Sequence, residues 1–136
     1  MDPTELGRLY KERSEREARQ KAETQAKIEK IKAVDAAIDR TLQTIAEEYL
    51  TRVKGEIGSD FAFVRKDAAS ETPGLLFTLR NRGFRFYASQ GTVQIARFSM
   101  PPMFDGQGLP PIKALSDLTE QNIGAYIKCL IGLPGG

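Results

Sequence analysis

The sequence contains no histidine and a single cysteine, Cys129. Without histidine the chain cannot form a Ser-His-Asp or Cys-His nucleophile, and it lacks the usual zinc ligand. One cysteine excludes an intramolecular disulfide and is typical of a reducing compartment, so we expect a cytoplasmic protein. Because no base is predicted to activate its thiol, we interpret Cys129 as a core or boundary residue. We therefore expect no catalytic residue, no cofactor and no metal site.

Long apolar runs are also missing from the sequence. No segment approaches the ~20 apolar residues of a membrane span, and the first residues lack the basic-then-apolar order of a signal peptide. We therefore expect no membrane association. The formal net charge is +2 with 28% of residues charged, and this near-balance argues against a strongly basic nucleic-acid binder of the histone type. The length of 136 residues is enough for one domain.

Glycine and proline are scarce early in the chain, where only Pro3 and Gly7 occur between Asp2 and Lys54. This scarcity predicts one long helix, which at ~1.5 Å per residue would reach roughly 75 Å. We call its first part the arm (residues 1–30), and most arm side chains beyond residue 10 are charged or alanine. Acidic residues precede basic ones by four positions, a spacing that stabilises a helix by ~0.2–0.5 kcal/mol per pair. The pairs are Glu12 and Arg16, Glu15 and Arg19, Glu17 and Lys21, and Glu23 and Lys27.

The arm has one narrow apolar line, formed by Ala18, Ala22 and Ala26. A strong coiled-coil seam needs leucine or isoleucine at its a and d positions. Two interpretations of the arm therefore stay open. It is either a solvated helix supported by its own ion pairs, or a helix that docks along a partner or a second copy, as in a coiled coil. The arm residues that we expect to contact a partner are Arg13, Arg16 and Arg19.

The rest of the long helix carries an apolar stripe whose steps of three and four residues match a straight helix that packs on a sheet. The stripe consists of Ile31, Val34, Ile38, Leu42, Ile45, Tyr49 and Val53. Gly55 and Gly58 then offer residues at which the helix can stop. We therefore predict that residues 31–136 form a single α+β domain, which we call the sheet domain, and that residues 1–30 lie outside it.

Four short runs have strand character and predict an antiparallel meander. They are residues 61–66, 75–80, 84–88 and 92–98. Two-residue turns at Arg82-Gly83 and at Gln90-Gly91 keep apolar and polar side chains on separate faces. These turns place Leu79 opposite Phe86, Phe77 opposite Ala88, Ala88 opposite Val93 and Phe86 opposite Ile95. One face then gathers Phe77, Leu79, Phe84, Phe86, Val93 and Ile95, with Phe61 and Phe63 joining it, and we expect the helix stripe to cover this face.

The opposite face of the predicted sheet carries Thr78, Arg80, Arg85, Tyr87, Thr92 and Gln94. Arg80 lies directly opposite Arg85 in this register, a destabilising arrangement unless something compensates the charges. Arg80, Arg85, Tyr87 and Gln94 are therefore our candidate binding residues on the sheet. Three interpretations stay open: an ordinary solvated face, a protein–protein surface, or a platform for single-stranded nucleic acid in which bases stack on Tyr87 and arginines pair with phosphates. Arm residues Arg8, Arg13, Arg16 and Arg19 would help the last of these.

The segment 99–113 contains four prolines and two glycines, which exclude regular structure, yet several of its residues are apolar. It is either a lid over one end of the core or an edge for a partner, and Met103 and Phe104 are the candidate contact residues. A last helix is predicted from Asp117 or Thr119, with Asp117 and Glu120 spaced as a capping box. Gly132 and Pro134 are predicted to end it.

The order of elements is similar in outline to RWD-type and kinetochore-like modules, where a coiled-coil arm precedes a small sheet flanked by helices. It also resembles the layout of the ubiquitin-conjugating fold, in its prolines before the last helix, although Cys129 does not match the active-site cysteine of those enzymes. This resemblance is one of layout and assigns no family.

We expect an α+β, non-enzymatic protein–protein interaction or adaptor module, self-associating as a homodimer through the arm or the proline-rich segment. The alternative is a nucleic-acid-binding protein that uses the Arg/Tyr face of the sheet. A third hypothesis is an enzyme in which carboxylates act as acid and base or hold Mg²⁺. The carboxylates available for it are those of Asp60, Asp67, Glu71 and Asp105, and nothing in their spacing brings them together.

Overall fold

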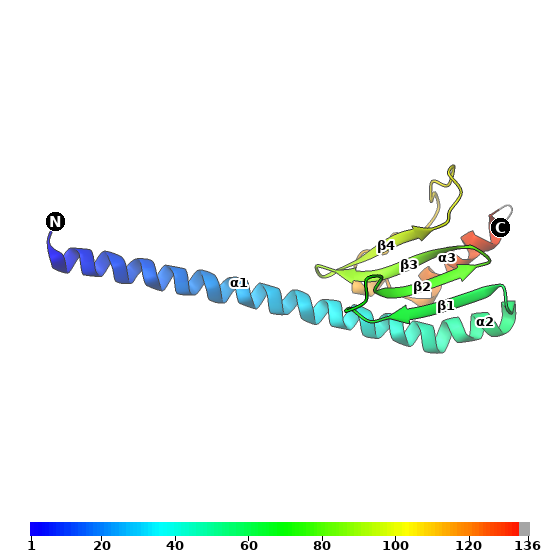
Figure 1. Cartoon of the computed structure of the whole chain (residues 1–136), viewed down its shortest axis with the longest axis horizontal. Helices are drawn as coiled ribbons and strands as arrows, with labels where there is room; N and C mark the ends of the chain where they lie inside the picture. Colours follow the sequence, from blue (N-terminus) through cyan, green and yellow to red (C-terminus); the bar gives the residue numbers. More distant parts are fainter. Residues whose placement is uncertain (134–136) are drawn as a thin grey trace.

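Four antiparallel strands and the helices that cover one of their faces form the body of the protein, and a long helix extends from it (Figure 1). The computed structural model describes residues 1–133. The elements in chain order are α1 (Pro3–Ile45), the π-helical segment η1 (Ala46–Leu50), α2 (Thr51–Ile57), β1 (Phe61–Lys66), β2 (Gly74–Leu79), β3 (Arg82–Ser89), β4 (Thr92–Phe98), the 3₁₀ turn η2 (Leu115–Asp117) and α3 (Glu120–Gly132). This confirms the predicted α+β class, with a long first helix, a four-stranded meander and a last helix.

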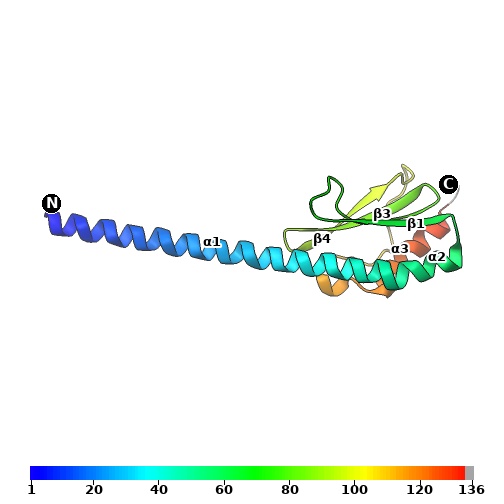
Figure 2. The same ribbon diagram turned by 60° about the horizontal axis from the view of Figure 1, so that its bottom comes forward.

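Helix α1 begins with Asp2 as its N-cap, whose carboxylate accepts a hydrogen bond from the Thr4 N–H at 3.2 Å, and Pro3 follows at the first helical position. Side chains of residues 1–33 are all exposed, and Figures 1 and 2 show this part of α1 leading away from the sheet. The predicted ion pairs of the arm are not formed within residues 1–133. Arg13 instead pairs with Glu17 at 3.1 Å. An ion pair between exposed side chains contributes little free energy in water. A spacing of four residues therefore does not by itself determine which side chains pair.

Part of the predicted apolar stripe is buried, namely Ile38, Leu42 and Ile45. Ile31, the first residue of the predicted stripe, does not pack against the core and is exposed. The sequence pattern also missed Leu50, which is fully buried. The reason is η1, where the Thr51 N–H reaches the Ala46 carbonyl in a π-helical turn. The wider turn rotates the following residues, so that Leu50 points into the core while Tyr49 and Val53 are half-buried at its margin.

The long helix does not stop at Gly55 but continues to Ile57 and is capped by Gly58, whose φ of 97° suits glycine. Lys54 donates a hydrogen bond from its Nζ to the Phe61 carbonyl at 2.8 Å, which ties α2 to the first residue of β1. The chain therefore reverses over a few residues and lays β1 antiparallel to the helix that precedes it (Figure 1).

The strands follow the order β1-β2-β3-β4, and the predicted register between β3 and β4 is confirmed. Ala88 lies opposite Val93, and Phe86 lies opposite Ile95. The turn between them is Gln90-Gly91, with φ values of 53° and 80°. Two successive positive φ angles match the twist of a tight hairpin, which explains why the glycine marked this turn correctly.

The predicted register between β2 and β3 is wrong. The turn is Arg80-Asn81, with Arg80 at a φ of 58°, so Leu79 pairs with Arg82 and Phe77 pairs with Phe84. Gly83 lies within β3, where a Cβ atom would overlap the Phe77 carbonyl oxygen and approach the Thr78 methyl group. Glycine is needed there for close approach of the strands and not for the turn. Because the register differs by an even number of residues, each strand keeps its predicted buried face.

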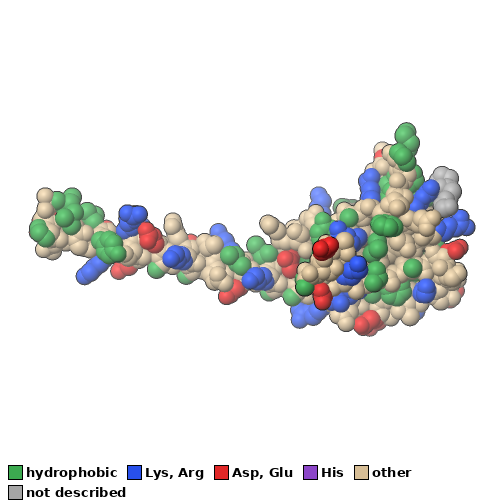
Figure 3. All heavy atoms as spheres, in the orientation of Figure 1, with side chains coloured by type: hydrophobic (Ala, Val, Ile, Leu, Met, Phe, Trp, Pro, Cys, Tyr) green, Lys and Arg blue, Asp and Glu red, His purple; other side chains and the backbone are tan. Residues whose placement is uncertain are grey.

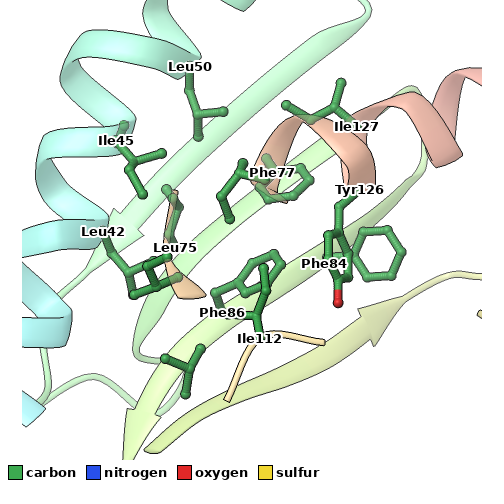
Figure 4. Packing of buried hydrophobic residues seen from close by; sticks show 14 of the residues in the cluster. Leu42, Ile45, Leu50, Leu75, Phe77, Phe84, Phe86, Ile112, Tyr126 and Ile127 are labelled. Carbon is green, nitrogen blue, oxygen red and sulfur yellow. The ribbon is translucent and has the colours of Figure 1, made fainter. Parts of the chain in front are cut away.

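The core lies between the sheet and the helices α1 and α3 (Figure 4). Four phenylalanines of the sheet, Phe61, Phe77, Phe84 and Phe86, are almost completely buried. Tyr126 of α3 meets Phe84 and Phe86 edge-on, with 5.1 Å between ring centroids in each pair. These contacts hold α3 against one face of the sheet, and Figure 2 shows no helix over the other face.

The proline-rich segment packs mainly onto the core, as the lid interpretation predicted for its apolar residues. Phe104 contacts Phe84, Ile112 is buried, and the Tyr126 hydroxyl donates to the Pro110 carbonyl at 2.7 Å. The exception is Met103, which is 92% exposed.

The predicted capping box of α3 is wrong, because the N-cap is Thr119, which accepts from the Asn122 N–H. Asp117 caps the preceding turn instead, where its Oδ2 accepts from the N–H groups of Lys113 and Ala114. Helix α3 ends at Gly132, near the predicted stop, and Pro134 lies outside the described residues.

Candidate interaction surface

The sheet face that points away from α1 and α3, here called the outer face, is not covered by a helix among the described residues (Figures 1 and 2). The alternation of side chains along each strand assigns its side chains: Ala62, Val64, Lys66, Leu76, Thr78, Arg85, Tyr87, Ser89, Thr92, Gln94, Ala96 and Phe98. Figure 3 shows hydrophobic side chains on this face, with charged side chains next to them. The outer face is therefore more apolar than the sequence analysis predicted.

The apolar residues that the sequence analysis missed are Val64, Leu76, Ala96 and Phe98. Val64 is 45% exposed and Phe98 is 47% exposed, although both are large apolar side chains. The same two-residue alternation that identified the buried face also places these four residues on the outer face. The sequence analysis used this alternation to assign only the polar residues of the outer face.

A depression of about 430 Å³, here called the slot, crosses the strands on the outer face. Its lining consists of Val64, Lys66, Thr72, Gly74, Leu76, Arg85, Ala96, Arg97 and Phe98. Val64, Leu76, Arg85 and Ala96 are successive cross-strand neighbours and form its floor across all four strands. The slot thus combines apolar walls with two basic side chains of the outer face, Lys66 and Arg85.

Arg85 is held in place by two contacts. Its Nη1 donates to the Pro73 carbonyl at 2.9 Å, and its guanidinium lies 4.3 Å from the centroid of the Tyr87 ring. Lys66 donates from its Nζ to the Thr72 hydroxyl at 3.2 Å. Both cations contact neutral oxygens, and neither forms an ion pair with a carboxylate among residues 1–133.

Only some of the predicted sheet residues come together. Tyr87 and Gln94 are cross-strand neighbours beside Arg85, and the Gln94 amide donates to the Thr92 hydroxyl at 2.9 Å. Arg80 is not opposite Arg85, as predicted, because it belongs to the β2–β3 turn. Its Nε lies 3.7 Å from a carboxylate oxygen of Asp60. Arg85 instead has Leu76 and Ala96 as its cross-strand neighbours.

The other candidate residues lie apart from the slot. Arg13, Arg16 and Arg19 are exposed on the part of α1 that leads away from the sheet (Figure 1). Phe104 is half-buried, with Arg97 stacked 4.8 Å from its ring centroid and donating to its carbonyl oxygen. Met103 is exposed beside it. The structure therefore presents several separate surfaces and does not join the candidates into one site.

The carboxylates of the enzyme hypothesis are not gathered either. Asp60 precedes β1 and Asp67 follows it, so the two lie at opposite ends of one strand. Asp105 accepts from the Gln107 N–H within its own loop. No group of three or more metal-ligating side chains forms within residues 1–133. Cys129 is half-buried on α3, and burial raises the pKa of its thiol, which disfavours the reactive thiolate.

Comparisons with protein-family models, with curated proteins and with solved structures find no match to this chain. The resemblance to RWD-type modules thus stays one of element order. Among the helices of residues 1–133, none has the length and apolar character needed to cross a membrane.

Proposed function

We propose that this chain is a non-enzymatic protein–protein interaction or adaptor module in which the sheet domain holds a helical arm and offers an outer sheet face. The observation that carries the proposal is that the side chains of residues 1–33 are all exposed although they belong to one continuous helix with the core residues Ile38 and Leu42. Helices in proteins owe most of their stability to a packed face. A helix this long without one has its full surface free to bind a partner.

The end of the arm supports this proposal. Leu6, Leu9 and Tyr10 follow the i, i+3, i+4 spacing of one helix face and are 51%, 42% and 72% exposed. They belong to the N-terminal end of α1, which lies away from the sheet domain in Figure 1, and the chain's own core does not cover them. Covering apolar area contributes about 25 cal/mol per Å², which favours contact with a partner or a second copy.

The base of the arm is fixed to the sheet domain, as an adaptor requires. The Gly91 N–H donates to the Asp35 carboxylate at 2.8 Å, which joins α1 to the β3–β4 turn. Ile38 and Leu42, which follow the arm in α1, are buried in the core of the sheet domain. A partner bound to the arm is therefore held at a defined direction from the sheet.

A photo-crosslinking amino acid placed at Tyr10 or at Ala22 of the full chain tests the proposal. Irradiation in the organism of origin should give discrete adducts from both positions, and an adduct of twice the chain mass with purified protein identifies self-association as a homodimer. The matched control is Gln121, which is exposed on α3. If the arm positions give no more adduct than Gln121, the arm is not an interaction surface.

A cytoplasmic location is part of the proposal, supported by the single cysteine. The nucleic-acid alternative has less support from the geometry than from the sequence. It used both Arg80 and Arg85 beside Tyr87 on one sheet face, whereas Arg80 lies near Asp60 at the end of the sheet.

A further inference from the structure

One position that lines the slot on the outer face requires glycine. Gly74 lines the slot and cannot carry a side chain. A Cβ atom at Gly74 would overlap the Phe86 carbonyl oxygen, and the φ of Gly74 is 100°. The floor between the neighbouring side chains therefore stays open, because the strand backbones approach too closely for any other residue.

The charged side chains that line the slot are all basic. Lys66 contacts the Thr72 hydroxyl, and Arg85 contacts the Pro73 carbonyl and the Tyr87 ring, so both cations have only neutral groups of the protein as partners. The guanidinium of the third basic lining residue, Arg97, lies against the Phe104 ring. No acidic residue is among the lining residues. The nearest acids along the chain, Asp67 and Glu71, lie in the β1–β2 loop beyond Lys66, and Asp67 accepts a hydrogen bond from the Ala69 N–H. A carboxylate that reaches Arg85 would meet a positioned guanidinium.

We propose that the slot binds an acidic, apolar peptide segment of a partner protein. An apolar side chain of the segment enters between Val64, Leu76 and Phe98, and a neighbouring carboxylate pairs with Arg85 or Lys66. This inference rests on the proposed function, since it names the chemistry of one partner of an adaptor. It concerns a surface that is distinct from the arm.

The walls of the slot favour a peptide over single-stranded nucleic acid. Bases bind by stacking on aromatic rings, whereas Val64, Leu76 and Ala96 are aliphatic and Phe98 is the single aromatic side chain among the lining residues. The ring of Tyr87, which the sequence analysis assigned to base stacking, already contacts the Arg85 guanidinium. Aliphatic side chains of a peptide fit such walls better than bases do.

The test selects dodecapeptides from a random phage-displayed library on the immobilised full chain. The recovered peptides are then synthesised with a fluorophore, and their binding is measured by fluorescence anisotropy. We expect sequences in which aspartate or glutamate flanks leucine, isoleucine or phenylalanine. Arg85→Glu and Leu76→Thr should each weaken binding by about tenfold or more, corresponding to ~1.4 kcal/mol.

Lys128→Glu is the matched control, because it makes the same charge change at an exposed position of α3 and should leave binding unchanged. Thermal unfolding followed by circular dichroism shows whether each variant is folded, and Arg85→Gln replaces Arg85→Glu if the latter is not. Recovery of no peptide, recovery of peptides without acidic residues, or equal binding by the Arg85 and Lys128 variants would each overturn the proposal. Displacement of the peptide by oligo-dT that itself requires Arg85 would assign the slot to nucleic acid instead.

Failure of this test is distinguishable from failure of the proposed function. Cross-links from Tyr10 and Ala22 report on the arm and do not involve Arg85 or Leu76. If these cross-links persist while the peptide selection fails, the adaptor proposal stands and only the slot is removed from it.

Discussion

The arm and the sheet domain are stabilised by different kinds of interaction. The arm is a helix whose side chains are all exposed, so its conformation depends on hydrogen bonds and side-chain pairs close in sequence. The sheet domain depends on contacts between residues far apart, such as the packing of Tyr126 on Phe84 and Phe86. Substitutions should therefore act locally in the arm and cooperatively in the sheet domain.

The largest expected effect comes from Phe77→Ala, since Phe77 is completely buried and contacts three other phenylalanine rings. We expect the free energy of unfolding of the sheet domain to fall by about 3–5 kcal/mol. Ala22→Gly, by contrast, should lower arm helicity through a local change of about 1 kcal/mol and leave the unfolding of the sheet domain unchanged. Urea unfolding followed by near- and far-ultraviolet circular dichroism separates the two effects. If both variants shifted the unfolding of the sheet domain equally, the arm and the sheet domain would not be stabilised by separate interactions.

Gly83→Ala tests whether the sheet domain requires glycine where two of its strands approach closely. Its Cβ atom would overlap the Phe77 carbonyl oxygen, so we expect a loss of about 3 kcal/mol in domain stability. Gly55→Ala is the control, because a Cβ atom at this helical position meets no atom within 4 Å. That variant should be stabilised by about 0.5–1 kcal/mol. Thermal unfolding of the two proteins should thus shift in opposite directions, and a stable Gly83→Ala protein would contradict the observed register of β2 and β3.

Tyr126→Phe removes one hydrogen bond and keeps the aromatic packing. The hydroxyl donates to the Pro110 carbonyl at 2.7 Å, so its loss should lower stability by about 1 kcal/mol. Amide hydrogen exchange should increase in the proline-rich segment more than in the strands. Tyr10→Phe on the arm, where the ring is 72% exposed, is expected to change neither measurement. Unchanged exchange around Pro110 in the Tyr126 variant would show that this hydrogen bond does not hold the segment.

The smallest effect is expected from Asp117→Asn and depends on pH. Hydrogen bonds from the Ala114 and Lys113 N–H groups lower the pKa of the Asp117 carboxyl from its ordinary value of 3.8. The folded state therefore gains stability from the carboxylate above that value and loses it as the pH falls through the lowered pKa. The variant should be less stable at pH 7, and the difference should narrow below about pH 4. Urea midpoints at both pH values measure it, and a constant difference would contradict this origin.

Much of the fold follows from periodic patterns in the sequence. The three- and four-residue steps of Ile38, Leu42 and Ile45 and the alternation of Phe84 and Phe86 identified buried faces correctly. These patterns report local geometry that any packed helix or strand shares. The patterns could not reveal Leu50, because the π-helical turn before it changes the period.

The wrong register between β2 and β3 arose because glycine serves two purposes. Gly91 forms a turn, whereas Gly83 allows close approach of two strands, and the sequence around each looks alike. The choice between them depends on the position of Phe77, a tertiary contact. The candidate site was identified in part, through Arg85, Tyr87 and Gln94, but the wrong register placed Arg80 there too. The slot itself arises from side chains on all four strands, which no single segment encodes.

Because α1 is one continuous helix, the number of residues between the distal end of the arm and the sheet domain sets the direction in which the distal side chains point. No break separates Leu9 from Ile38, and the latter is anchored in the core. Inserting one residue between them would turn Leu6, Leu9 and Tyr10 by about 100° around the helix axis and move them outward by ~1.5 Å. The direction in which these distal apolar side chains point is thus set by the number of intervening residues. Four inserted residues would bring them back to within about 40° of that direction and lengthen the arm by ~6 Å.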